Sequence, residues 1–501
     1  MIIPSRARAF GIAATLVAAL GGALVALHYH RLGLTLSHYD ARGHLVVARR
    51  IIDSVTPGWQ QIGAVWLPLP HLLNALPVQV DSWYRTGGSA VAFSIAAFAL
   101  AAGALGWTVA AITGSIGAGV AGVAVFVLSP NVLYVQATPL SEPLLLGTTT
   151  LAVALLLDWC RAQDLENSAA GRSTRTTRTG MAFALACLSR YEAWPVTLLA
   201  LAAVAWARLR AGDHWRVAIR RVLSVAVFPA GAILAYAVFS RVVIGEWLVA
   251  SGFFVPENIA LGHPWNAASQ VMWGVRTLSG YGVTAAAALG LVGLLVLGLI
   301  DRQRAFLLVP LSLLGTAAVP WAAFIDGHPY RIRYMIPLIA AQAIGLGAAA
   351  GLVRRFRPIL IPAALALIAF DLRPLDAQAP MVVEAQWDRP NVAARQRVTG
   401  CLQAGYDGET IMASMGSLGH YMQELSLAGF SIRDFLHEGN GDIWLAALTG
   451  PRPYAGWLLI EEQAEGGDML AQIARAEPRF LDGFTRVCEG AGVALYRRKP
   501  R

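Results

Sequence analysis

The feature that most constrains this chain is a series of apolar runs, each about as long as a bilayer is thick. A helix of roughly 20 predominantly apolar residues crosses the hydrocarbon core. Only 14% of the 501 residues are charged, against about 25% in soluble domains. The sequence therefore predicts a polytopic α-helical membrane protein. The runs lie at 10–28, 90–112, 117–133, 143–159, 180–189 with 194–207, 222–239, 283–300, 305–324, 335–353 and 359–372.

The arginines between the runs predict the orientation. Four connectors are basic, and the positive-inside rule assigns them all to the cytoplasm: RAQDLENSAAGRSTRTTR from Arg161, RLRAGDHWRVAIRR from Arg208, DRQR from Asp301 and RRFR from Arg354. This works only if 180–207 crosses twice, as a hairpin with SRYEAWP at its outer tip, rather than once as a kinked span. We then expect about eleven transmembrane helices in a bacterial inner membrane, with an uncleaved first span and a cytoplasmic N-terminus. The net charge of +9 is mostly an orientation signal, so no nucleic-acid partner is expected.

The composition changes near Asp376, which divides the chain into a transmembrane domain over 1–372 and a C-terminal domain over 373–501. Strand-like runs, TIMASM, WLLIEE and VALYRR, alternate with helix-like runs, NVAARQRVTGCL, SLGHYMQELSLAG and DMLAQIARAE. This alternation predicts a small soluble α/β domain, and the topology assigns it to the periplasmic or extracellular side. Cys401 and Cys488 both lie in it. They either form a disulfide in an oxidising compartment or are small buried hydrophobes.

The long first periplasmic loop, 31–89, carries the polar stretch LSHYDARGHLVVARRI directly after the first span. A helix over 41–55 would be amphipathic and lie in the membrane interface. Asp40 and His44 are four residues apart at its start and would project together, which makes Asp40 a candidate general base. The alternative is structural. Ser37 and Asp40 also fit a helix-capping pattern, which leaves Asp40 as a cap and His44 as an interfacial histidine.

Two further groups of charges are expected at the same outer face. Glu142 opens a span in ATPLSEPLLL, where the helix dipole alone favours a carboxylate. Arg190, Tyr191 and Glu192 form the hairpin tip. A charge in apolar surroundings costs about 2.5–3.5 kcal/mol near a helix centre, so such residues are usually paired or functional.

The loop IDGHPYRIRYMIP adds His328, Arg331, Arg333 and Tyr334. Its arginines oppose the positive-inside rule, so they either bind an anionic partner or extend to lipid headgroups. With the other groups, this loop predicts one outward-facing cavity suited to a phosphate leaving group. The charged residues of that cavity are Asp40, Glu142, Glu192, Arg190, Arg331 and Arg333.

Several short motifs also resemble those of a known superfamily. An aspartate just past the first span is followed by WLPLPHLL, SEP, SRYEAWP and RYMIP. As a set, over roughly residues 10–353, they are similar to the GT-C membrane glycosyltransferases, and most to the protein O-mannosyltransferase and lipid A aminoarabinose transferase branch. The resemblance implies a polyprenyl-phosphate sugar donor, transfer on the periplasmic side and a catalytic aspartate, which maps onto Asp40. It also maps Glu142 onto a second acidic position, Arg333 and Tyr334 onto a pair near the donor phosphate, and Arg190 onto a basic residue of the fifth span.

The chain departs from the GT-C pattern at the first-loop site. Many relatives carry paired acidic residues there, whereas Ala41 follows Asp40 in this sequence. His44 could supply a second ligand, but one aspartate and one histidine are a weak metal signal. A divalent metal at Asp40 and His44 therefore stays open, and no other cofactor is assigned.

The leading interpretation is an inverting glycosyltransferase. Asp40 would deprotonate an acceptor hydroxyl on a glycan, lipid or protein, and the donor phosphate would bind Arg331, Arg333, Tyr334 and Arg190. The acceptor side is expected to include His44, Glu142, Tyr191, Glu192 and His328. One alternative is a transporter of a lipid-linked sugar or other anionic lipid, because charges within a bundle also mark translocation pathways. Transporters usually show internal repeats, and none is visible here. The other alternative is a non-catalytic GT-C-like scaffold.

Overall fold

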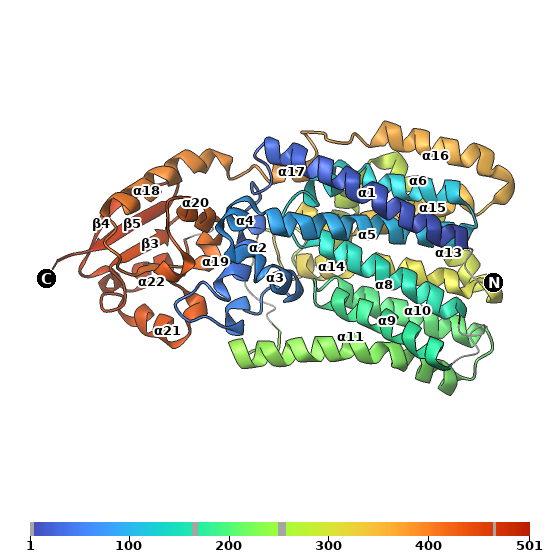
Figure 1. Cartoon of the computed structure of the whole chain (residues 1–501), viewed down its shortest axis with the longest axis horizontal. Coiled ribbons are helices and arrows are strands. Elements are labelled where there is room, and N and C mark those ends of the chain that lie inside the picture. Colours follow the sequence, from blue (N-terminus) through green and yellow to red (C-terminus); the bar gives the residue numbers. More distant parts are fainter. Residues whose placement is uncertain (1–4, 163–168, 249–256, 464–466, 501) are drawn as a thin grey trace.

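The computed structural model describes residues 5–162, 169–248, 257–463 and 467–500, and it joins a helical bundle end to end with a smaller sheet domain (Figure 1). Among the described residues, seven helical segments are long and apolar enough to cross a membrane, as expected for a multi-pass membrane protein. They are α1 (Ser5–Arg31), α5 (Gly88–Thr113), α8 (Glu142–Ala162), α11 (Trp215–Ile244), α13 (Tyr281–Ile300), η3 with α14 (Arg302–Ala317 and Ala318–Ile325), and η4 with α15 (Ile332–Met335 and Leu338–Gly351).

The other predicted spans contain shorter or more polar helices, so the count of about eleven crossings stays a prediction. The run at 117–133 is divided into α6 (Ile116–Val127) and α7 (Pro130–Val135). It breaks there because Ser129 caps a new helix and Pro130 takes the first position. The region 180–207 forms two helices, as the hairpin interpretation requires. These are α9 (Ala169–Cys187) and α10 (Ala193–Arg210); α12 (Pro264–Ser279), η5 (Arg354–Phe356) and α16 (Arg357–Asp371) complete the bundle.

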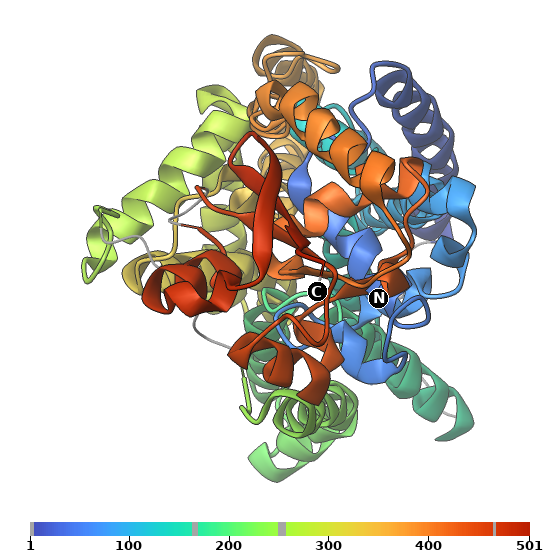
Figure 2. The same ribbon diagram turned by 90° about the vertical axis from the view of Figure 1, so that its left-hand side faces the viewer.

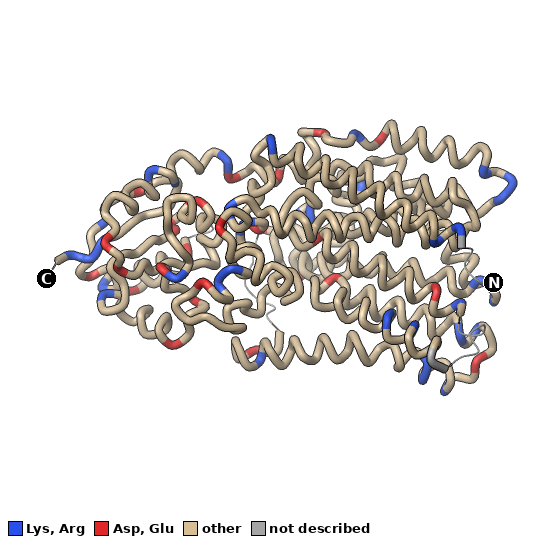
Figure 3. Tube along the Cα trace, viewed as in Figure 1, with Lys and Arg blue, Asp and Glu red and all other residues tan. Residues whose placement is uncertain are grey.

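The arginine-rich connectors meet at the end of the bundle remote from the sheet domain (Figure 3). Arg8, near the start of α1, pairs with Asp158, near the end of α8, at 2.8 Å. Arg210, at the end of α10, donates to the carbonyl oxygen of Leu299 in α13 at 3.1 Å. The connectors therefore share one end, as the positive-inside argument requires. Residues 163–168 of the first connector lie outside the described part of the chain.

Small residues let the helices that lead into the site approach closely. A Cβ added to Gly290 of α13 would lie 1.8 Å from the carbonyl oxygen of Gly345 in α15. A Cβ added to Gly147 of α8 would lie 2.6 Å from the carbonyl oxygen of Ala97 in α5. These backbone contacts fix the neighbours of α8 and α15, the two helices that carry or directly follow the charged residues discussed below.

The described C-terminal residues form a five-stranded sheet of order β2-β1-β3-β5-β4, in which β1 is parallel to both neighbours and β5 antiparallel to both. The strands are β1 (Ile411–Ala413), β2 (Phe435–Leu436), β3 (Trp457–Glu461), β4 (Phe484–Gly490) and β5 (Val493–Arg498). β1, β3 and β5 confirm the three predicted strands. β2 has only two residues and β4 is an edge strand with mostly exposed side chains, so neither carries a clear sequence signal.

Helices cover both faces of this sheet, and a disulfide joins Cys401 of α18 to Cys488 of β4. The formation of this bond decides between the two alternatives for these cysteines. The helices of the domain are α17 (Pro380–Glu384), α18 (Val392–Gly405), α19 (Met415–Leu418), α20 (Met422–Leu427), α21 (Asp442–Thr449) and α22 (Met469–Ala476), with short turns η6 (Arg389–Asn391), η7 (Gly419–Tyr421), η8 (Ile432–Asp434), η9 (Glu438–Asn440) and η11 (Pro478–Leu481).

The first loop is enclosed between the bundle and the sheet domain, which covers that end of the molecule (Figure 2). Its first helix, α2 (Tyr39–Arg50), is shorter than the expected helix over 41–55. Leu45 and Ala48 of α2 belong to the same buried cluster as Ile411 of the sheet. Arg49 and Asp53, on the polar side of this segment, are also buried, at 8% and 2% exposed. Protein thus encloses the segment, and its position at the membrane interface stays a prediction. The loop continues with η1 (Trp59–Ile62), α3 (Leu69–Asn74), η2 (Pro77–Gln79) and α4 (Asp81–Thr86).

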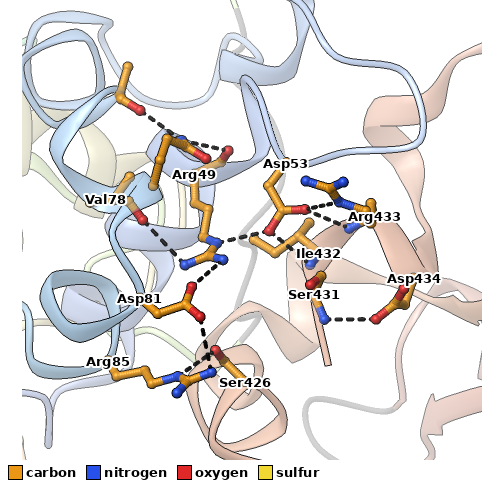
Figure 4. A network of polar contacts seen from close by, with 12 residues as sticks. Arg49, Asp53, Val78, Asp81, Arg85, Ser426, Ser431, Ile432, Arg433 and Asp434 are labelled. Atoms are coloured by element: carbon orange, nitrogen blue, oxygen red, sulfur yellow. Dashed lines mark hydrogen bonds and ion pairs between the residues drawn. The ribbon is translucent and has the colours of Figure 1, made fainter. Parts of the chain in front are cut away.

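Hydrogen bonds and ion pairs between charged side chains link the first loop to the sheet domain (Figure 4). The buried carboxylate of Asp53 accepts hydrogen bonds from Arg49 at 2.8 Å and from Arg433 of the sheet domain at 3.0 Å. A second ion pair, at 3.2 Å, joins Arg42 of α2 to Asp388. Both ends of α2 are thus tied to the C-terminal part of the chain, which fixes the position of its first turn.

Candidate active site

Asp40 lies in the first turn of α2, and its carboxylate does not cap that helix. The cap is His38, whose Nδ1 accepts a hydrogen bond from the backbone N–H of Asp40 at 3.1 Å. The Ser37 hydroxyl donates instead to the carbonyl oxygen of Leu34, so the capping interpretation of Asp40 is wrong. The Asp40 side chain forms an ion pair with Arg333 of η4, and the residue is only 8% exposed.

Five charged side chains from separate parts of the chain form one connected cluster. Arg333 lies between Asp40 and Glu142, with its Nη1 3.9 Å from Oε1 of Glu142. Arg190, at the tip between α9 and α10, pairs with the same Glu142 oxygen at 3.0 Å and with Glu192 at 2.7 Å. Three carboxylates are thus held with two guanidiniums. Glu142 is fully buried and Arg333 is 6% exposed, and charges this buried require such pairing.

Some polar atoms of this cluster have no hydrogen-bond partner among the described residues. They are Nε and Nη1 of Arg333 and Oε2 of Glu142, and all three are buried. An unsatisfied buried polar group costs about 1–3 kcal/mol, and more when it is charged. An anion that takes the place of Asp40 at Nη2 would also satisfy one of these nitrogens, because Nη2 forms a fork with either Nε or Nη1 that matches two oxygens of phosphate or carboxylate.

His44 lies one helical turn after Asp40, but both of its ring nitrogens have partners. Nε2 is 3.3 Å from Oγ of Ser141, and Nδ1 is 3.0 Å from Nε2 of His71. Burial, followed by the effect of His71 and nearby arginines, lowers the pKa of His44 well below its ordinary value. Both nitrogens of His44 thus contact other side chains, and a divalent metal at Asp40 and His44 stays a prediction. The described ranges contain no group of three or more histidines, cysteines or acids that could hold a metal ion.

Comparison with solved structures gives matches over nearly the whole chain. ArnT from Cupriavidus metallidurans in the apo state has a TM-score of 0.58 and 12% identity, covering 96% of this chain and 98% of that one. ArnT bound to undecaprenyl phosphate gives 0.57 at the same identity and coverage. The apo oligosaccharyltransferase of Archaeoglobus fulgidus gives 0.54 at 12% identity, covering 90% of this chain and 70% of that one. The chain has the GT-C fold. No protein-family model and no curated protein matches the sequence.

The GT-C fold brings together the positions that the sequence motifs singled out. Asp40, Glu142, Arg190 and Arg333 are far apart in the chain, and they lie in one ion-pair cluster. Tyr334 adjoins it, since the guanidinium carbon of Arg333 is 5.3 Å from the centre of the Tyr334 ring. The cluster lies where the bundle meets the first loop, at the end that faces the sheet domain.

Other predicted residues line the edge of this cluster. The guanidinium of Arg331 lies over the ring of Tyr39, the neighbour of Asp40, at 5.9 Å. The ring of His328 packs edge-on against the ring of Tyr334 at 5.5 Å. The loop that carries these residues therefore runs directly along the charged cluster.

Tyr191 has a different environment from the one expected. Its hydroxyl lies 2.8 Å from the hydroxyl of Tyr236 in α11 and 3.3 Å from the carbonyl oxygen of Ala64. Tyr191 thus connects the hairpin tip to α11 and the first loop, and it makes no ion-pair contact with the charged cluster.

Three residues beside the cluster are missing from the sequence-based prediction. Ser141 accepts a hydrogen bond from Arg190 at 3.0 Å, His71 contacts His44, and the ring of Trp66 lies 4.1 Å from that of His44. Ser141 belongs to the SEP motif, and Trp66 and His71 belong to WLPLPHLL. These motifs were the available signal, but helical periodicity does not predict which residues of a loop meet across it.

Proposed function

We propose that this chain is an inverting glycosyltransferase that moves a sugar from a polyprenyl-phosphate donor to a hydroxyl acceptor. The observation that carries the proposal is the buried pair of Asp40 and Arg333, in which two further nitrogens of Arg333 have no hydrogen-bond partner among the described residues. The structure of the similar ArnT contains undecaprenyl phosphate, which supports a lipid-phosphate donor for this GT-C fold.

Asp40 is the proposed general base. The donor phosphate replaces Asp40 as the partner of Arg333, and the freed carboxylate takes the proton of the acceptor hydroxyl. The acceptor oxygen then bonds to the anomeric carbon while the bond from that carbon to the phosphate oxygen breaks. The electron pair leaves with the phosphate, whose developing charge Arg333 and Arg190 stabilise. Attack opposite the leaving group inverts the anomeric carbon.

The remaining predicted site residues take supporting roles in this proposal. Arg331 and Tyr334 flank the phosphate, and His328 is the candidate for acceptor contact. Glu142 and Glu192 hold Arg190 through ion pairs of 3.0 and 2.7 Å, so we assign them to positioning. The assay described below, run with and without added divalent metal, tests whether a metal takes part.

The proposed orientation has the arginine-rich end of the bundle in the cytoplasm of a bacterial cell. The transmembrane domain over 1–372 then lies in the inner membrane, and the domain over 373–501 lies in the periplasm. The disulfide between Cys401 and Cys488 supports this side, because such bonds persist mainly in oxidising compartments.

The deciding experiment is sugar release from a panel of polyprenyl-phosphate sugars, with and without added divalent metal. Purified wild type is compared with Asp40→Asn, and with Asp326→Asn as the matched control, since Asp326 is an exposed carboxylate near the same loop. We expect one donor to be turned over, and Asp40→Asn to lose about 10²–10⁴-fold in kcat. Equal turnover by wild type and Asp40→Asn would contradict the role of Asp40. No turnover of any donor, even with acceptors present, would favour a transporter or a scaffold.

A further inference from the structure

A chain of hydrogen bonds leads from Arg190 into the first loop. Nη1 of Arg190 donates to Oγ of Ser141 at 3.0 Å. The same oxygen lies 3.3 Å from Nε2 of His44, whose Nδ1 lies 3.0 Å from Nε2 of His71. Ser141, His44 and His71 are all buried, and His71 is fully so. None of the three is a reacting group in the proposed mechanism, so this chain of hydrogen bonds needs another explanation.

The positive charge of Arg190 sets the direction of donation along this chain of hydrogen bonds. A guanidinium only donates, so Oγ of Ser141 accepts from Arg190. The field of the cation turns the hydroxyl hydrogen away from it, toward Nε2 of His44. Nε2 then accepts, the hydrogen of the neutral ring lies on Nδ1, and that N–H donates to Nε2 of His71. Every dipole in this hydrogen-bond chain has its negative end toward Arg190, and successive hydrogen bonds in such a chain polarise one another.

This chain of hydrogen bonds is a second connection between the segments, beside the ion pairs that join Arg190 to Glu142 and Arg333 to Asp40. Arg190 lies between α9 and α10, outside both helices. Glu192 is in the same tip, whereas Glu142 of α8 pairs with Arg190 at 3.0 Å and ties the tip to the bundle. Ser141 precedes the first residue of α8, and His44 is on α2, one turn after Asp40. The hydrogen-bond chain therefore links Arg190, which is proposed to bind the phosphate, to α2, the helix that carries the proposed base.

We infer that Ser141, His44 and His71 are positioning residues, which hold Arg190 at a set distance from Asp40 through a one-way chain of hydrogen bonds with both histidines as neutral Nδ1–H tautomers. The functional part of this inference rests on the proposed glycosyl transfer, because Arg190 is held in place to bind the donor phosphate. A shift of about 1 Å in a reacting group can cost about 100-fold in rate, which is why a loop-borne arginine needs such support.

Kinetics of two His71 variants form the first arm of the test. His71→Leu removes the acceptor for Nδ1–H of His44, whereas His71→Gln offers an amide oxygen in its place. With the lipid-phosphate sugar that wild type turns over, we expect His71→Leu to lose about 10–100-fold in kcat with KM little changed, because the interaction acts in the transition state. His71→Gln should recover most of this loss. His263→Leu, at an exposed histidine, is the control. A wild-type kcat in His71→Leu would overturn the inference.

The second arm does not depend on turnover. Nitrogen-15 NMR of the full chain, labelled at its ten histidines, distinguishes the two neutral tautomers and the charged ring. We expect His44 and His71 as Nδ1–H tautomers in wild type, and a changed His44 signal in His71→Leu. A wild-type His44 that is charged, or that carries its hydrogen on Nε2, overturns the inference even if the variants fail to fold. If the tautomers are as expected but no donor is turned over, the proposed function fails and the hydrogen-bond chain stands.

Discussion

His437 is a single residue that couples stability to pH. It is fully buried in the sheet domain, and its Nδ1 accepts a hydrogen bond from the backbone N–H of Gly439 at 3.1 Å. Burial, followed by the charge of Arg50, lowers the pKa of His437 to about 3. An unfolded histidine has a pKa of about 6.5, so between these values the unfolded chain binds a proton that the folded chain does not.

The free energy of unfolding should therefore fall as the pH is lowered from about 6.5 toward 3, by up to about 1.4 kcal/mol per pH unit for this residue. His437→Asn keeps a side-chain acceptor for the turn but does not titrate. We expect its Tm to fall less than that of wild type between pH 7.5 and pH 5. His263→Asn, at an exposed position, should follow wild type. If all three lose Tm equally over this range, His437 is not the source of the dependence.

At the scale of residues, the sequence predicts the charged side chains of the site better than their partners. Arg190 is singled out by its apolar surroundings, and Arg333 because it opposes the positive-inside rule. Asp40 and Glu142 are singled out by their place at the start of a helix and by the motifs that contain them. The cap of α2 is assigned wrongly, since Ser and Asp are the common caps and the chain uses His38. Asp40 is occupied by Arg333 instead, a partner that no local pattern can identify.

At the scale of elements, hydropathy predicts the spans because a single property, apolar length, defines them. It does not distinguish an interfacial α2 from an enclosed one, since an amphipathic pattern is the same whether headgroups or protein cover the polar side. Strands β1, β3 and β5 are predicted from their buried runs. The short edge elements are not, because pairing with neighbours rather than their own sequence makes them strands.

The contact of α13 with α15 gives a prediction at the scale of elements. Gly290→Ala would push a methyl group against the backbone of Gly345, so we expect a loss of about 1–3 kcal/mol or more. Gly231→Ala in α11, where nothing lies within 4 Å of the added Cβ, should instead be neutral or slightly stabilising, by up to about 1 kcal/mol. Thermal unfolding in detergent compares the two. Equal Tm values would mean that these helices do not touch at Gly290.

At the scale of the whole molecule, the common location of the arginine-rich connectors predicts orientation. Cys160 and Cys187 are buried and Cys401 is bonded to Cys488, so the native chain offers little background to thiol reagents. We expect Asp442→Cys, on the exposed surface of the sheet domain, to react in intact cells with a reagent that does not cross membranes. Gln303→Cys, in an exposed connector, should react only after the membrane is opened. Labelling in the reverse order would invert the proposed topology.

The enclosure of the first loop by the C-terminal domain also affects how the protein is made. Gln61 contacts Gly439 at a separation of 378 residues, and Asp53 contacts Arg433 at 380. A ribosome adds about 5–20 residues per second, so the first loop waits roughly 20–75 s for these partners. A chain still being translated, or one cut short by a nonsense codon, lacks the support of α2 and should be inert. Under the proposed function, catalytic competence would then arrive only with the last part of the message, and incomplete chains would not act on the lipid-phosphate donor.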